Sequence, residues 1–193
     1  MHLPDTWAER FPVLEPLEDD WKRVPRAVLI LACVFYGLFL IQAARGSGPF
    51  LMVDLVFIPI HEGGHLLFRI FGEVMMVAGG TLLQLAAPLM LAAVFIFQRQ
   101  VPGTAFCIFF FFEQFLPIST YMADARALEL PLLTVGDGED VIHDWNYLFG
   151  RFGLLHYDTQ IAHAVGVMGW VGMIATVAWM IWRSIASQQT SQK

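Results

Sequence analysis

Five apolar segments, each long enough to cross a lipid bilayer, constrain this 193-residue chain more than any other feature. A spanning helix needs about 20 mostly apolar residues, because the hydrocarbon core of a bilayer is about 30 Å thick. Helices satisfy their own backbone hydrogen bonds in that core. The sequence therefore predicts an all-α fold, a polytopic membrane helix bundle of about five transmembrane helices. The segments run approximately over Ala27–Ala44, Leu51–Phe71, Val77–Phe97, Thr104–Ala127 and Ile161–Trp182.

Composition and charge narrow the function classes. Hydrophobic residues make up 57% of the chain and charged residues only 15%, which is typical of a multi-pass membrane protein. The formal net charge of −6 argues against nucleic acid as a partner. Cys33 and Cys107 both fall in predicted spans, so no disulfide framework and no Cys-based metal site is expected.

The apolar segments also define the domain organisation. Residues 1–26 hold four prolines, which prevent one long helix, so this segment is expected to lie at the membrane interface. Residues 27–183 form the transmembrane domain, and residues 184–193 a polar tail. The only sizeable connection is 130–160. Its part His143–Leu155 is amphipathic and aromatic, as in helices that lie on a bilayer surface.

Basic residues predict the orientation of the chain in the cell membrane. With five spans, the N-terminus and the second and fourth loops share one side. That side carries seven of the 11 Lys and Arg residues, and the other side carries four. Because cytoplasmic loops carry the excess of Lys and Arg, we expect a cytoplasmic N-terminus.

The second apolar segment contains His61-Glu62-Gly63-Gly64-His65, a His-Glu-x-x-His pattern. On a helix, His61 and His65 lie one turn apart on the same face, so that two imidazoles can bind one metal ion. Glu62 lies about 100° around the helix from His61 and is placed to act on a water molecule rather than to bind the metal. Ionisable groups at membrane depth are costly and usually mark a functional site. A structural interhelical hydrogen-bond cluster is the alternative.

A catalytic zinc site usually has three protein ligands, so a third ligand must come from elsewhere in the chain. We prefer Asp124, because the second and fourth predicted helices run in the same direction and Asp124 lies near the end of the fourth. That position is at a depth comparable with those of His61 and His65. His143 and Asp144 follow in the next loop and remain alternatives.

Two other carboxylates lie too far along their helices. Glu113 is about 16 Å further back along the same predicted helix than Asp124, at 1.5 Å per residue. Asp54 is on the same face as His61 but about 10 Å from it along the axis. Neither is expected to bind the ion.

Glycines and alanines recur where predicted helices can approach each other closely. They are Gly63, Gly64, Gly79 and Gly80 in the second and third spans, and Ala162, Gly166, Gly169 and Gly172 on one face of the last span.

Three motifs together resemble those of the site-2-protease-like intramembrane zinc metalloproteases. The signature of that family joins His-Glu-x-x-His, Gly-Pro-x-x-Asn, and Asn-x-x-Pro followed by Asp-Gly. The first part is intact, Gly80–Gln84 (GTLLQ) is similar to the second, and Gln114–Pro117 (QFLP) followed by Asp124-Ala125 is similar to the third. This chain has Thr for Pro, Gln for both Asn residues and Ala for Gly, and its Pro-to-Asp spacing is two residues longer. The resemblance covers about residues 51–127.

The resemblance implies a zinc ion held by His61, His65 and Asp124, with Glu62 as general base. It also implies that Gln84 lies near the substrate backbone, although an interhelical hydrogen bond explains a buried amide there equally well. The implied activity is hydrolysis of peptide bonds in membrane-embedded or membrane-proximal substrates.

Two functions without proteolysis remain as alternatives. One is a membrane protein that binds a metal for structure or transport, and the other is a pseudoprotease that binds transmembrane helices. Glu62 favours the enzyme, because a structural metal site has no need of a base between its ligands.

Overall fold

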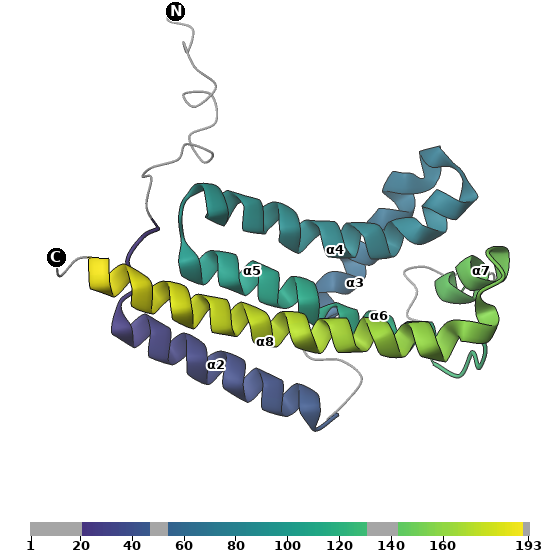
Figure 1. Ribbon diagram of the computed structural model, residues 1–193. Helices are drawn as coiled ribbons and strands as arrows, with labels where there is room; N and C mark the ends of the chain where they lie inside the picture. Colours follow the sequence, from purple (N-terminus) through teal and green to yellow (C-terminus); the bar gives the residue numbers. More distant parts are fainter. Residues whose placement is uncertain (1–20, 47–53, 131–142, 191–193) are drawn as a thin grey trace, which may run out of the picture. The chain divides into compact units, whose positions relative to one another are not determined.

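The computed structural model describes residues 21–46, 54–130 and 143–190 of the chain (Figure 1). These ranges are helical and contain no strand, which confirms the all-α prediction. The predicted interfacial segment before residue 21 and residues 131–142 of the long connection lie outside the described residues. The described elements are α2 (Arg26–Ala44), α3 (Asp54–Phe68), η2 (Arg69–Phe71), α4 (Glu73–Phe97), α5 (Val101–Glu113), α6 (Phe115–Ala123), α7 (Asp144–Arg151), η3 (Leu155–Tyr157) and α8 (Asp158–Thr190).

Four helical segments are long and apolar enough to cross a membrane: Arg26–Ala44, Glu73–Phe97, Val101–Ala123 and Leu155–Ala186. Large apolar side chains are exposed along them, as expected for surfaces that contact lipid. The chain is therefore a helical membrane protein.

The described residues hold four such segments rather than the five predicted, because the second predicted span is short. Its described part, α3, has 15 residues, which at 1.5 Å per residue is about 22 Å. The helix continues only as the single turn η2 and ends at Gly72, whose φ of +94° suits glycine.

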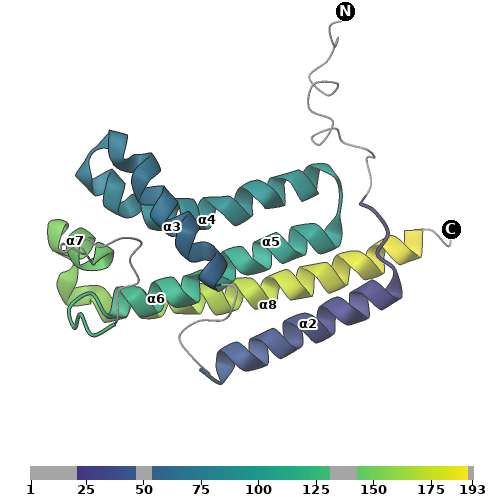
Figure 2. The same cartoon turned by 180° about the vertical axis from the view of Figure 1, so that it is seen from behind.

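Beyond Gly72 the chain returns as α4, so that α3 and the first half of α4 form a helical hairpin (Figure 2). The two backbones meet at glycines, as the small-residue pattern predicted. A Cβ on Gly64 would overlap the carbonyl oxygen of Gly79, and a Cβ on Gly79 would lie 2.6 Å from the carbonyl oxygen of Gly64. No larger residue fits at this crossing, which brings the side chains of α3 and α4 together.

The spanning segment Val101–Ala123, which was the fourth predicted span, is broken between α5 and α6 at Gln114. Pro117 lies three residues further on, inside α6. Proline has no N–H to donate to the carbonyl of Glu113, and its ring clashes with that carbonyl, so the helical ladder is interrupted there. The break falls at a polar pair, Glu113 and Gln114, that is almost fully buried.

The short helix α7 supports the prediction that His143–Leu155 is helical and amphipathic. Its apolar side belongs to a buried cluster from α6, the turn after it, α7 and α8, which consists of Ile118, Met122, Ala125, Phe149 and Ala162. The side chain of Asn146 donates a hydrogen bond of 2.7 Å to the carbonyl oxygen of Ala125. These contacts fix α7 against the end of α6.

The chain forms two compact units, and several helices contribute to both. The aromatic unit, as we call it, comprises Met1–Ser47, Pro88–Phe110 and Met173–Lys193. Its core contains interleaved rings: Tyr36 and Phe109 have centroids 4.6 Å apart, and Phe39 meets Phe109 edge-on at 5.4 Å. Such pairs are favourable beyond the area that they bury.

The polar unit comprises Gly48–Ala87 and Phe111–Gly172 and holds the hairpin, α6 and α7. Within it α8 packs through its small residues, as predicted: a Cβ on Gly169 would lie 2.9 Å from the carbonyl oxygen of Phe112, and Gly166 lies against Ser119.

Candidate metal centre

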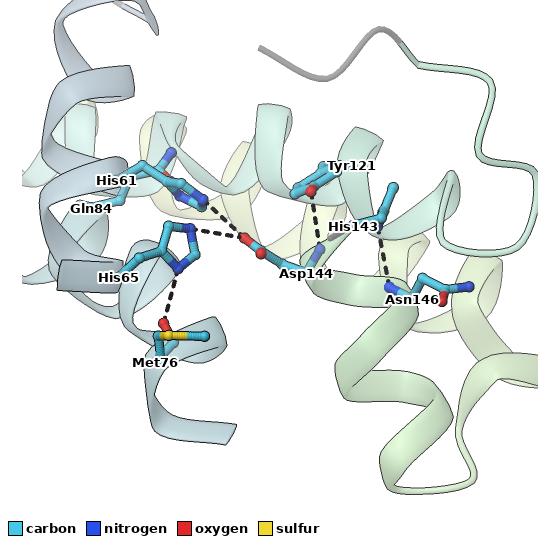
Figure 3. Close-up of polar contacts among 8 residues, drawn as sticks. All are labelled: His61, His65, Met76, Gln84, Tyr121, His143, Asp144 and Asn146. Atoms are coloured by element: carbon cyan, nitrogen blue, oxygen red, sulfur yellow. Dashed lines mark hydrogen bonds and ion pairs between the residues drawn. The ribbon is translucent and has the colours of Figure 1, made fainter. Parts of the chain in front are cut away.

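Three ligand-type side chains converge within the polar unit: His61, His65 and Asp144. Both histidines come from α3 and Asp144 from the first turn of α7 (Figure 3). The Nε2 atoms of His61 and His65 lie 3.0 and 3.4 Å from Oδ2 of Asp144. One ligand atom of each residue lies within 4.8 Å of those of the other two. The prediction that His61 and His65 share one face of a helix is thus confirmed.

The two imidazoles are held by their other nitrogens. Nδ1 of His65 donates to the backbone carbonyl oxygen of Met76 over 2.9 Å. Nδ1 of His61 donates to Oε1 of Gln84 over 2.9 Å. A hydrogen bond of this kind fixes both the tautomer and the ring orientation of a histidine that binds a metal.

This arrangement directs electron pairs at one point. With Nδ1 protonated, a neutral imidazole presents a lone pair at Nε2, and the Asp144 carboxylate presents another. Without a metal, protons on Nε2 make these contacts hydrogen bonds to the carboxylate, and a bound metal ion would take the place of those protons. Two ligands about 2.05 Å from zinc at a tetrahedral angle are about 3.3 Å apart, close to the observed 3.0 and 3.4 Å. The donor set therefore fits a divalent metal ion.

Asp144 is placed by its own backbone and by its neighbours. Its N–H donates to the hydroxyl oxygen of Tyr121 over 3.1 Å. His143 caps the start of α7, with Nδ1 accepting a hydrogen bond from the N–H of Asn146. Burial on its own raises the pKa of the Asp144 carboxyl, but the hydrogen bonds with His61 and His65 outweigh that effect and hold the pKa below its ordinary value. The Asp144 side chain is therefore ionised at neutral pH.

Asp124, the predicted third ligand, does not join the histidines. Its carboxylate accepts hydrogen bonds from the backbone N–H groups of Glu129 and Leu130, at 2.9 and 3.1 Å. Its Oδ2 also lies 3.4 Å from Nε2 of His143. The side chain thus ends α6 and holds the following turn, which is the backbone cap expected of an Asp at a helix end. Among the described residues Asp144 takes the place assigned to Asp124.

Gln84 forms the interhelical hydrogen bonds that were the alternative to a contact with substrate. Besides accepting from His61, it donates from Nε2 to Oε1 of Gln114 over 2.6 Å. Gln114 in turn donates to Glu113. Glu113 is not among the converging ligands, as expected, yet it is connected to them.

Glu62 is half-buried and lies within electrostatic range of His65 and of Tyr121. It therefore adds negative charge beside the converging ligands without being one of them.

Comparisons of the chain with protein-family models, with curated proteins and with solved structures find no match.

The sequence pattern left Asp144 as an alternative because it follows a long connection. One signal could have identified it: Asp144 lies in the first turn of a helix, where acidic residues are enriched. The docking of α7 through Asn146 and Tyr121, which decides between Asp124 and Asp144, depends on contacts between distant parts of the chain.

Proposed function

We propose that this protein is an intramembrane zinc metalloprotease that hydrolyses peptide bonds of membrane-embedded or membrane-proximal substrates. The observation that carries the proposal is the convergence of His61, His65 and Asp144, with Glu62 beside them in a His-Glu-x-x-His sequence. Two imidazoles and one carboxylate make a three-ligand set with one position left for water or substrate.

The choice of zinc rests on the donor set. Nitrogen and carboxylate ligands at tetrahedral spacing suit zinc, whereas calcium and magnesium prefer an all-oxygen shell of higher coordination number. Histidine, moreover, is held here through Nδ1 to a carbonyl or amide oxygen, the usual outer contact of a zinc-binding imidazole.

The chemistry divides between the ion and the protein. When bound, zinc lowers the pKa of water towards neutrality and polarises a carbonyl group. Glu62 accepts the proton of the attacking water and passes it to the leaving amine. His61, His65 and Asp144 hold the ligand geometry, which α7 and the α3–α4 hairpin fix in advance.

The membrane setting defines the class of substrate. A peptide bond within a helix is shielded, because its carbonyl is already hydrogen-bonded in the helix. The substrate is therefore a membrane protein or peptide whose helix unwinds locally or ends near the site. The apolar surfaces of the four spanning segments suit contact with such a helix and with lipid.

The proposal includes an orientation with a cytoplasmic N-terminus. With four spans, the segment before α2, the turn at 98–100 and the end of α8 share one side of the membrane. Basic residues in the described ranges are more numerous on that side, which favours the cytoplasm. They are Lys22, Arg23, Arg26, Arg99 and Arg183, against Arg45, Arg69, Arg126 and Arg151 on the other side.

The decisive experiment compares wild type with Glu62→Gln in liposomes, with a panel of single-span peptides as substrates. The amide keeps the shape of the side chain but removes the base, so zinc content should be retained while cleavage falls by about 10²–10⁴-fold. Glu129→Gln, at an exposed carboxylate that is not among the converging ligands, is the matched control and should cleave like wild type.

Two results would contradict the proposal. Equal cleavage by wild type and Glu62→Gln would mean that the activity arises elsewhere. Zinc binding by both proteins without any cleavage would favour a metal-binding protein or pseudoprotease, the alternatives without catalysis.

A further inference from the structure

A chain of three buried hydrogen bonds leads from His61 to Glu113. Oε1 of Gln84 accepts from Nδ1 of His61 over 2.9 Å, and Nε2 of Gln84 donates to Oε1 of Gln114 over 2.6 Å. Nε2 of Gln114 then donates to Oε2 of Glu113, again over 2.6 Å. Gln84, Gln114 and Glu113 are only 8%, 0% and 1% exposed, so water does not substitute for these partners. We call these four residues the relay.

The direction of every hydrogen bond in the relay follows from the residue at its end. Gln114 donates from its NH₂ group to Oε2 of Glu113, so its oxygen is turned towards Gln84. Gln84 must then turn its own NH₂ group towards Gln114 and its oxygen towards His61. An oxygen facing Nδ1 requires that Nδ1 carries a proton, so that Nε2 is the nitrogen available to a metal once its own hydrogen bond with Asp144 is replaced.

We propose that Glu113 is a positioning residue that fixes the tautomer of His61 through Gln114 and Gln84. The inference rests on the proposed function in that Nε2 is useful only if a metal binds there. Without the carboxylate both amides can turn over together, and Nδ1 then accepts a hydrogen bond while Nε2 holds the proton. A protonated Nε2 cannot bind a metal ion.

His65 provides an internal reference for this idea. Its Nδ1 donates to the backbone carbonyl oxygen of Met76, which cannot turn over and has no proton to donate. The tautomer of His65 is therefore fixed without any distant group. A change at Glu113 should affect His61 and leave His65 as it is.

The location of the relay explains a costly feature of the sequence. Glu113 and Gln114 lie at the break between α5 and α6, in a segment long and apolar enough to span the membrane. A carboxylate is expensive there and usually has a functional partner. The relay supplies that partner, since it connects the carboxylate to the imidazole that faces the ion.

The test uses the full-length, metal-free protein in detergent with ¹⁵N-labelled histidine. In wild type the ¹⁵N chemical shifts should report a protonated Nδ1 at both His61 and His65. In Glu113→Gln a second set of signals, with no proton on Nδ1, should appear for His61 alone. The zinc dissociation constant of this variant should rise by about 10–100-fold, the usual effect of losing an outer hydrogen-bond partner of a ligand.

Two further variants control for folding. Asp158→Asn changes another buried carboxylate of the polar unit, which pairs with Arg126 outside the relay, and should leave both tautomers and the zinc affinity unchanged. Gln114→Met interrupts the relay with a side chain of similar size and should reproduce the effect of Glu113→Gln if that variant does not fold.

The outcomes separate this inference from the proposed function. A folded Glu113→Gln or Gln114→Met protein with unchanged Nδ1 protonation of His61 would overturn the inference, and so would a wild-type His61 without a proton on Nδ1. Loss of the Nδ1 tautomer in a protein that binds no zinc would support the relay and contradict the proposed function.

Discussion

The two units of this protein fill their interiors with different chemistry. The described part of the aromatic unit contains no Asp, Glu or His at all, and its buried polar residues are Thr104, Thr176 and Ser184. Every buried acidic, histidine or amide side chain described belongs to the polar unit: Gln84, Glu113, Gln114, Asp124, His143, Asp144 and Asp158.

This contrast shows what each unit contributes. Ring packing stabilises the core of the aromatic unit and takes no part in a reaction or in metal binding. The polar unit accepts the desolvation cost of buried charge and offsets it with paired hydrogen bonds. Charge that is segregated in this way indicates function rather than general stabilisation.

The largest expected effect tests whether Asp144 completes the ligand set. Asp144→Ala should bind zinc more than about 100-fold more weakly than wild type, since removing a ligand exceeds the loss of an outer hydrogen-bond partner. Asp124→Asn should keep about one zinc per chain, because the amide oxygen can still accept from a backbone N–H of the following turn. Elemental analysis of the purified proteins would check both, and the reverse pattern would restore Asp124 as the ligand.

A smaller loss of zinc affinity is expected when a glycine of the polar unit is changed to alanine, whereas the same change in the aromatic unit serves as a control. A Cβ on Gly80 would lie 2.6 Å from Nε2 of His61 and 2.7 Å from Nε2 of His65, so Gly80→Ala must displace both ligand atoms. Zinc affinity should fall by about 10-fold or more, as for other disturbances of ligand orientation.

Gly37→Ala is the matched control in the aromatic unit, because a Cβ there meets nothing within 4 Å. It should leave zinc affinity unchanged and stabilise α2 by up to about 1 kcal/mol, the usual difference between Gly and Ala within a helix. Zinc titration and thermal unfolding of the two variants measure the contrast. Equal zinc affinities would remove the link between the α3–α4 crossing and the site.

The smallest expected effect is a loss of folding stability as the pH falls. Burial lowers the pKa of His143, although the nearby Asp124 carboxylate partly offsets this. The folded protein therefore binds fewer protons at this position than the unfolded chain, so stability falls as the pH drops below the ordinary His pKa of about 6.5.

The free energy of unfolding of the metal-free protein should accordingly decrease between about pH 7.5 and pH 5.5. His143→Gln should show a smaller decrease, because the titrating group has been removed. Denaturant titration at the two pH values provides the measurement. Identical pH dependence in both proteins would show that His143 titrates normally.

Much of this contrast could be predicted from local sequence. The spacing of His61 and His65 specifies one helical face, and four of the five apolar segments specify spanning helices. Glycine positions likewise identified the crossing of α3 and α4, because only the absence of a side chain permits that approach.

The third ligand could not be predicted in the same way. Asp124 would match the depth of the histidines only if the second and fourth predicted helices were continuous and of similar length. The described part of the second, α3, is short, and the segment Val101–Ala123 breaks at Gln114. The relay could not be predicted from the sequence for the same reason. A uniform rise per residue places Glu113 far from the histidines, but side chains on three elements bridge that distance.

The position of Asp144 on α7 also sets when the site can exist during synthesis. Asp144 follows His61 by 83 residues. At about 5–20 residues per second, a ribosome needs roughly 4 to 17 seconds to make that length of chain. During this interval the two histidines of α3 have been made, but the carboxylate has not. A nascent chain that ends before α7 therefore lacks the third member of the cluster, and the three side chains can converge only after α7 has been made.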